Sequence, residues 1–404
     1  MLSAAWASTP SIPGDLLPAV KDPDPAIPAH PDLESHRIGL YETGRPGPRV
    51  IIVGGMHGNE PGGVLALQRV LAELEELRLP LRGRLLCLGG NLEALRRGQR
   101  FIDRDLNRVW GYGQEVPEGP GIYEFEVRDR LQAEIEPVLE GATEPVVFLD
   151  LHSTSAGGAP FSIIGDTRQN RRIALGLPVP VILGLEESVD GALLGYFGER
   201  GHIAVGFEGG QHDDPLTVDH HEAAVWITLI RAGALLREEV PRAVEFYDRL
   251  REGARGRPGV IEMRHRHHVR AEDEFSMREG FANFDPIARG DVLATDASGQ
   301  VTSPESGLLL LPLYQGQGQD GFFVGREVRR FWLRVSTAMR ALRLGELVHW
   351  MPGVSRVEGA TPTVEVRPSV ARWWVVEIFH LLGFRRVRAV EGRLRFSRRV
   401  EGLP

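Results

Sequence analysis

The sequence has little cysteine and little lysine. It holds one cysteine, Cys87, in 404 residues, so no disulfide can form within the chain. A single cysteine also fits a reducing compartment. Only one of the 47 basic residues is a lysine, Lys21, and a GC-rich genome explains this more simply than a functional role does.

Excess positive charge and long apolar runs are also missing. The net charge of −8 argues against a general nucleic-acid binder, because affinity for phosphate depends on clustered lysine and arginine. The longest strongly apolar runs without charge, residues 173–185 and 307–314, are shorter than the ~18 residues that cross a bilayer. The N-terminus has no basic segment, and Pro10 interrupts its short apolar stretch, so we predict no signal peptide and a cytoplasmic protein.

What is present is the composition of a folded α/β protein. Hydrophobic residues make up 42% and charged residues 25% of the chain, while 48 glycines and 28 prolines favour a loop-rich fold. The length predicts two to three domains at roughly 150 residues each. We expect an extended, proline-rich lead-in over residues 1–35, a catalytic domain over 36–255, a smaller β domain over 256–329 and an α+β extension of unknown role over 330–404.

Apolar strands alternate with helices in the second of these regions. Short apolar runs predict strands at residues 50–53, 85–88, 146–151, 179–185 and 203–207. Helical spacing predicts helices at residues 61–78, 91–97, 122–139, 192–199 and 216–236. The alternation indicates an α/β fold with a mixed sheet covered by helices on both faces. Ligands on such sheets usually bind outside the carboxyl ends of the strands.

The strongest chemical signal lies at two of these strand ends. Residues 55–60, GMHGNE, stand between a buried strand and a helix, and His57 and Glu60 are close enough on this turn to reach one point. His152 follows Asp150 at the end of another core strand. An isolated loop histidine is usually not a ligand, but a His/Glu/His set at one sheet edge suits Zn²⁺ and leaves a fourth position open for water. Asp150 could then orient one of these metal ligands without itself contacting the metal.

Three weaker signals accompany this set. Residues 100–108, RFIDRDLNR, form either a solvated loop or a clamp for an anion, since guanidinium groups pair well with carboxylates. Glu208 directly follows the apolar strand 203–207. It acts either as a general base and acid beside the metal or as a structural hydrogen-bond acceptor. His220 and His221 lie in a predicted helix, and we expect them at its surface.

The order of the four motifs resembles one known family. G-x-H-G-N-E, then R-x-x-D-x-D-L-N-R, then D-L-H-x-T and a strand-terminal glutamate are similar to the succinylglutamate desuccinylase/aspartoacylase family, within the zinc carboxypeptidase-like hydrolases. The resemblance covers about residues 36–325. It implies one zinc ion per chain held by His57, Glu60 and His152, with Glu208 as the catalytic glutamate.

The same resemblance implies roles for three residues of the arginine-rich segment. Arg100 would polarise the scissile carbonyl, while Asn107 and Arg108 would grip a carboxylate of the substrate. Two family features have no secure match: a further arginine, where this chain has Gly198, and a tyrosine, for which Tyr314 is the nearest equivalent. The identity of the acyl group therefore stays open.

The resemblance implies a zinc-dependent deacylase that cleaves the amide bond of a small N-acyl amino acid or related acyl compound. Three alternatives stay open: an ester hydrolase, a zinc carboxypeptidase on the same site, and a non-catalytic binding module that retains the fold. The expected partner is a small molecule bearing a carboxylate, without nucleic acid or membrane, and self-association is left open.

Overall fold

The computed structural model describes residues 33–111, 121–351, 353–357, 362–367, 373–390 and 393–399. The predicted lead-in therefore lies outside the described residues, apart from residues 33–35. No helix in these described ranges is long and apolar enough to span a bilayer.

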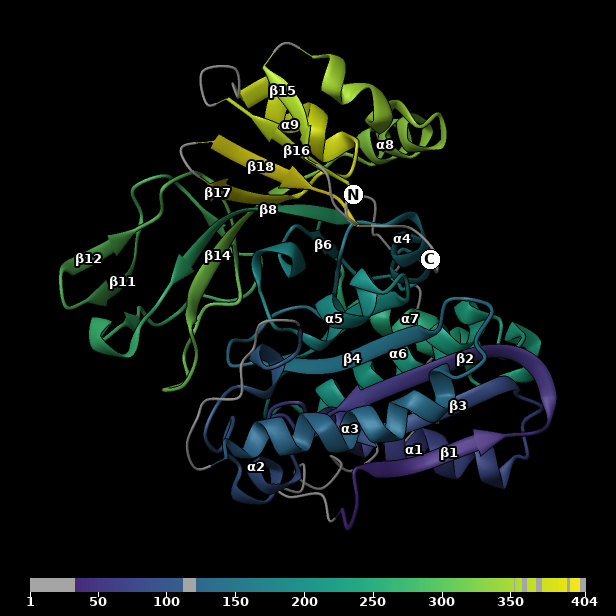
Figure 1. The fold of residues 1–404 in the computed structure, drawn as a ribbon. Coiled ribbons are helices and arrows are strands. Elements are labelled where there is room, and N and C mark those ends of the chain that lie inside the picture. Colours follow the sequence, from purple (N-terminus) through teal and green to yellow (C-terminus); the bar gives the residue numbers. More distant parts are fainter. Residues whose placement is uncertain are drawn as a thin grey trace, which may run out of the picture.

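One 11-stranded mixed sheet runs through the molecule (Figure 1). Its strands, in spatial order, are β1 (Arg37–Glu42), β3 (Arg82–Gly89), β2 (Arg45–Gly54), β4 (Val147–Thr154), β7 (Ile203–Gln211), β5 (Phe161–Ile164), β6 (Val181–Leu183), β8 (Val260–His268), β14 (Asp320–Glu327), β13 (Gly307–Leu310) and β10 (Pro286–Ile287). Strands β3, β2, β4 and β7 are parallel, so their carboxyl ends share one edge of the sheet.

Helices cover both faces of the central strands. Helices α1 (Gly62–Glu76), α6 (Pro215–Ala232) and α7 (Ala243–Gly253) lie on one face, and α3 (Tyr123–Leu139) and α5 (Leu193–Glu199) lie on the other. The alternation of side chains along β2 explains this, because Val50 and Ile52 enter the first core while Ile51 and Val53 enter the second. The predicted mixed sheet with helices on both faces is confirmed.

Local signals explain where individual helices begin and end. Asn91 accepts a hydrogen bond from the amide of Ala94 and caps the short helix α2 (Leu92–Arg97). Asp214 caps α6 in the same way, and that helix ends at Gly233, whose φ of 84° lies in the left-handed region. Every helix and strand predicted before residue 255 is present, with bounds shifted by a few residues. Four elements of this region were not predicted: β1, β5, α7 and α4 (Arg168–Ala174).

The region predicted as a β domain is continuous with the main sheet. Strand β8 pairs in parallel with β6, and β14, β13 and β10 extend the sheet from there. A separate three-stranded sheet consists of β9 (Ser276–Met277), β11 (Val292–Asp296) and β12 (Gly299–Thr302).

The C-terminal extension has a core of its own. It consists of α8 (Arg330–Ala341), β15 (Val354–Val357), β16 (Thr363–Val366), α9 (Trp373–Leu381), β17 (Arg386–Val390) and β18 (Arg393–Ser397). Its four strands form one sheet around buried Val366, Phe379 and Phe396. Figure 1 shows the extension beside β8 and β6, at the end of the molecule away from β1.

Candidate functional site

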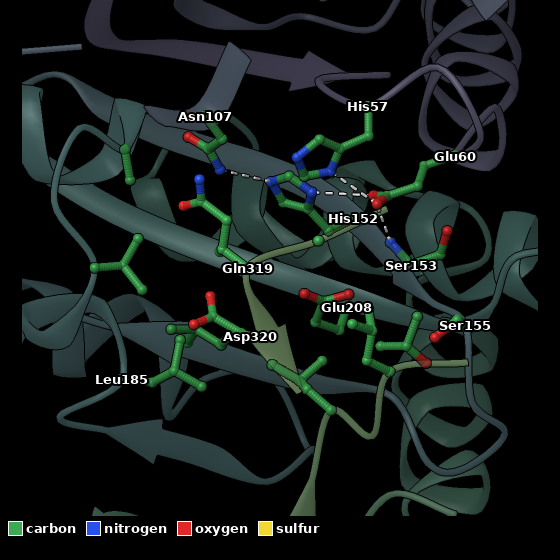
Figure 2. A pocket seen from close by; sticks show the side chains of 18 of the residues that line it. His57, Glu60, Asn107, His152, Ser153, Ser155, Leu185, Glu208, Gln319 and Asp320 are labelled. Carbon is green, nitrogen blue, oxygen red and sulfur yellow. Dashed lines mark hydrogen bonds and ion pairs between the residues drawn. The ribbon is translucent and has the colours of Figure 1, made fainter. Parts of the chain in front are cut away.

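The parallel arrangement of β2 and β4 brings the predicted metal ligands together. His57 and Glu60 lie on the loop that joins β2 to α1, and His152 lies in β4. His57 Nδ1 is 2.8 Å from Glu60 Oε1, and His152 Nδ1 is 3.0 Å from Glu60 Oε2, as Figure 2 shows. All three side chains are buried, and their ligand atoms lie within 4.8 Å of one another.

The hydrogen bonds behind the two histidines fit a metal centre. His57 Nε2 donates to Asp105 Oδ1 over 3.0 Å, and His152 Nε2 donates to Asp150 Oδ2 over 2.9 Å. A proton held on Nε2 by a carboxylate leaves the lone pair of Nδ1 free to coordinate a metal. The sequence predicted this role for Asp150, but not for Asp105.

The ionisation of Glu60 also fits a metal ligand. Burial opposes ionisation of Glu60, but His57 and His152 hold the pKa of this carboxyl well below its usual range. Burial also disfavours a charged His152, yet Asp150 and Glu60 raise its pKa well above the ordinary histidine value, so a metal that binds Nδ1 must displace a proton from it. Glu60 is thus an anionic ligand, and the set could hold a divalent cation.

Arg100 lies directly beside this set. Its Nη1 is 3.4 Å from Glu60 Oε1, and its Nη2 donates to Asp105 Oδ2 over 3.1 Å. Its Nε is buried and finds no hydrogen-bond partner within the described ranges. A guanidinium in this position can stabilise negative charge that develops next to a bound metal.

A buried glutamate holds the loop that carries Arg100. Glu124 is 0% exposed, and its carboxylate accepts hydrogen bonds from the backbone amides of residues 102, 103 and 104, at 2.7, 3.1 and 3.0 Å. Sequence analysis missed this residue. The available signal was an acidic residue in the first turn of the helix predicted at 122–139, directly after the arginine-rich segment.

Asn107 and Arg108 lie on the other side of His152. The Asn107 amide nitrogen lies 3.4 Å from His152 Nε2 and its oxygen accepts from the Leu193 amide at 2.9 Å. Arg108 Nη2 donates to Asp320 Oδ2 over 3.0 Å. Figure 2 places Asn107, Gln319 and Asp320 around the space in front of His152.

Asp320 is a site residue that the sequence did not reveal. It begins β14, and its other oxygen, Oδ1, accepts from Arg266 Nε at 2.6 Å. The three charges of Arg108, Asp320 and Arg266 sum to one positive charge. This end of the pocket therefore still attracts an anion.

Glu208 faces the pocket from the neighbouring strand. It stands directly opposite His152 in the pairing of β7 with β4 and is 7% exposed. Its Oε2 is buried and has no hydrogen-bond partner among the described residues. Burial raises the pKa of Glu208 to about 8, although the charge of His152 acts in the opposite direction. A carboxyl with such a pKa can exchange a proton near neutral pH.

One pocket, with a cavity volume of about 160 Å³, is lined by all seven residues that the sequence singled out. They are His57, Glu60, Arg100, Asn107, Arg108, His152 and Glu208. Tyr314 does not line this pocket, and its hydroxyl donates to the backbone carbonyl of Arg278 over 2.9 Å.

The expectation for two other histidines is wrong. His220 and His221 are buried, and His221 Nε2 donates to the backbone carbonyl of His152 over 2.8 Å. Helix α6 packs against α1, α7 and the sheet, so polar residues of this helix are buried as well as apolar ones. His221 therefore supports the strand that carries a metal ligand.

The fold and the site define an α/β protein with a buried His–Glu–His set at the carboxyl ends of its central strands. Residues 46–231 match the family model of the succinylglutamate desuccinylase/aspartoacylase catalytic domain. This match confirms the resemblance that the order of the motifs indicated.

Curated relatives match over short stretches. Succinylglutamate desuccinylase from Pseudomonas paraeruginosa is 32% identical over 125 residues, which cover 27% of this chain and 36% of that protein. The enzyme of the same name from Yersinia pestis is 42% identical over 62 residues, which cover 15% of this chain and 19% of the relative. The chain thus spans about a third of the length of the first relative and about a fifth of the length of the second.

Solved structures share the fold over a larger part of the chain. Succinylglutamate desuccinylase from Vibrio cholerae has a TM-score of 0.52 at 19% identity, covering 71% of this chain and 83% of that one. A product-bound ectoine utilization protein EutE (DoeB) from Ruegeria pomeroyi has a TM-score of 0.52 at 20% identity, covering 71% of this chain and 87% of that one. At these identities the likeness concerns the fold alone.

Proposed function

We propose that this protein is a zinc-dependent hydrolase that cleaves the amide bond of a small N-acyl amino acid, or related acyl compound, that bears a carboxylate. The observation that carries the proposal is the buried set of His57, Glu60 and His152 with Glu208 on the adjacent strand. The names of the curated relatives support an amide substrate of this kind.

The three ligands would hold Zn²⁺ through His57 Nδ1, a Glu60 oxygen and His152 Nδ1. Two nitrogens and one carboxylate oxygen are a donor set that zinc uses in catalytic sites. When bound, zinc would act as a Lewis acid toward the scissile carbonyl and promote the ionisation of water.

Side chains of the protein carry out the proton transfer, the stabilisation of charge and the orientation of the substrate. Glu208 accepts the proton of the attacking water at Oε2, the oxygen that lacks a partner, and then passes it to the leaving amine. Arg100 stabilises the negative charge that develops on the carbonyl oxygen. Asn107 and Arg108 orient the carboxylate of the substrate, at the end of the pocket with net positive charge.

The test is release of free amine by purified protein loaded with zinc. The panel contains N-acetyl and N-succinyl amino acids, the matching O-acyl esters and short peptides with a free carboxyl terminus. We expect amine release from at least one N-acyl amino acid and its loss after chelation of the metal. Cleavage of esters or peptides alone would move the assignment to those reactions, and no cleavage of any compound by zinc-loaded protein would overturn it.

A further inference from the structure

The C-terminal extension reaches the wall of the substrate pocket. Arg399, two residues after β18, forms an ion pair with Glu186, which belongs to the 3-10 turn Glu186–Ser188. Glu186 is 4% exposed and lines the pocket together with buried Ile163 and Leu185. A residue from the extension thus contacts a residue of the pocket wall.

The catalytic domain leaves a space for this guanidinium. A Cβ atom added to Gly198 would lie 2.2 Å from Arg399 Nη1, and one added to Gly165 would lie 3.0 Å from Arg399 Cζ. Any other residue at Gly198 would displace Arg399. The absence of side chains at Gly165 and Gly198 therefore leaves the space that the Arg399 side chain occupies.

Two further buried carboxylates hold the extension in place. Asp166 accepts from Arg340 Nη2 at 2.7 Å and forms an ion pair with Arg385. Glu262, at the start of β8, accepts from Arg385 Nη1 at 2.6 Å and from His380 Nδ1 at 2.8 Å. These contacts fix the extension against the sheet that carries the site.

The ion pair gives this part of the pocket a different charge from the Arg108 end. The charges of Arg399 and Glu186 cancel each other. Glu186 Oε2 is buried and has no hydrogen-bond partner in the part of the chain that the structure describes. Burial raises the pKa of Glu186 to about 7, while Arg399 opposes this shift. An anion placed here would be desolvated beside a carboxylate, with the neighbouring cation already paired.

We infer that the C-terminal extension completes the substrate pocket, and that the Glu186–Arg399 pair admits substrates with one carboxylate and excludes a second. The single carboxylate binds near Arg108, and the other end of the substrate is uncharged or cationic. Glu186 determines specificity and Arg399 is a positioning residue. The inference rests on the proposed function for its reaction, but its charge preference can be measured by binding alone.

The test compares Nα-acetylnorleucine with Nα-acetylglutamate, which have side chains of similar length and one or two carboxylates. The assay is run above about pH 8, where Glu186 is ionised. We expect the wild type to favour the monocarboxylate in kcat/KM by about tenfold or more. Glu186→Gln, which leaves Arg399 available, should reduce this preference by at least about tenfold, mainly through KM.

Glu187→Gln is the matched control, because Glu187 carries the same charge next along the chain and does not line the pocket. It should keep the preference of the wild type. The double variant Glu186→Gln/Arg399→Gln should also keep it, since it removes the cation together with the anion. Melting temperatures of all variants show whether a change in preference reflects loss of folding.

Calorimetric binding of both compounds to zinc-loaded wild type and Glu186→Gln separates this inference from the proposed reaction. If neither compound is cleaved but the binding preference shifts as expected, the proposed reaction fails and the inference stands. A wild type that binds both equally, binds neither or favours the dicarboxylate overturns the inference. So does a folded Glu186→Gln variant with an unchanged preference.

Discussion

At the scale of single residues, the environment of each side chain decides its chemistry. Glu60 and Glu208 are both buried glutamates in one pocket, yet their pKa values shift in opposite directions. Two histidines keep Glu60 ionised, whereas burial dominates at Glu208 and raises its pKa to about 8. One carboxylate is therefore suited to hold a cation and the other to move a proton.

This difference predicts the effect of Glu208→Gln. The amide keeps the shape of the side chain but cannot accept the proton of water, so kcat should fall about 10³-fold while zinc stays bound. Steady-state amine release and zinc content measure both effects. Glu126→Gln, at an exposed position of α3, is the control and should behave as wild type. Near-normal turnover of Glu208→Gln would remove this residue from the mechanism.

Four of the seven lining residues could be predicted because each lies at the end of a buried strand or directly after it: His57, Glu60, His152 and Glu208. The other three, Arg100, Asn107 and Arg108, were identified through the resemblance of their motif to a known family. Residues such as Asp105, Glu186 and Asp320 could not be assigned. Their roles depend on partners that the chain brings close only on folding, such as the contact of Asp320 with Arg108. No local pattern records such a contact.

At the scale of elements, the loops between strand and helix require close backbone packing. A Cβ on Gly58, between the ligands His57 and Glu60, would lie 2.0 Å from the backbone carbonyl carbon of Ala94 and 2.4 Å from the oxygen of Gln99. Backbone atoms cannot rotate away as a flexible side chain can. The glycine therefore fixes how the metal-binding loop lies against α2 and the following residues.

Gly58→Ala should displace this loop. We expect a loss of about 2 kcal/mol or more in the free energy of unfolding and weaker zinc binding, because the added methyl group overpacks a closed contact. Urea unfolding and zinc titration measure these effects. Gly316→Ala, where an added Cβ meets nothing within 4 Å, should change neither. Equal stability and zinc affinity of the two variants would contradict this role for Gly58.

The elements that the sequence revealed are those with continuous apolar runs or long helical periodicity, such as β4 and α1. Strand β5 has four residues and β1 lies at the edge of the sheet, so neither shows a strong local pattern. The junction of β8 with β6 could not be foreseen, because pairing of strands distant in sequence leaves no periodic signal in either.

At the scale of the whole molecule, buried ion pairs join the extension to the catalytic region. Asp166 is 0% exposed at its side chain and contacts Arg171 as well as two arginines of the extension. Burial opposes its ionisation, but Arg340, Arg171 and Arg385 hold the pKa of Asp166 well below its usual range. Glu262 likewise has a lowered pKa, against the effect of burial, because of His380 and Arg385.

These shifts predict a loss of stability in acid. A carboxyl whose pKa is depressed on folding stabilises the protein above its ordinary pKa of about 4, and this stabilisation is lost as the pH falls through the folded value. Asp166→Asn should lower the free energy of unfolding at pH 7 by about 3 kcal/mol or more. Its deficit should shrink as the pH falls below about 4, because this carboxyl then takes up a proton in the unfolded wild type while folded Asp166 stays ionised to lower pH.

Urea unfolding across this pH range measures the difference between variant and wild type. Asp129→Asn, at a side chain 65% exposed, is the control and should change little at any pH. A deficit for Asp166→Asn that stays constant with pH would mean that ionised Asp166 does not stabilise the docked extension.

The central claim is that His57, Glu60 and His152 bind the zinc on which hydrolysis depends. The most direct measurement is a titration of metal-free protein with zinc, with bound metal and amine release followed in the same samples. We predict one zinc ion per chain, activity that rises with occupancy and levels off at one equivalent, and neither in His57→Ala/His152→Ala. No bound zinc in the wild type, or full amine release without metal, would contradict the claim.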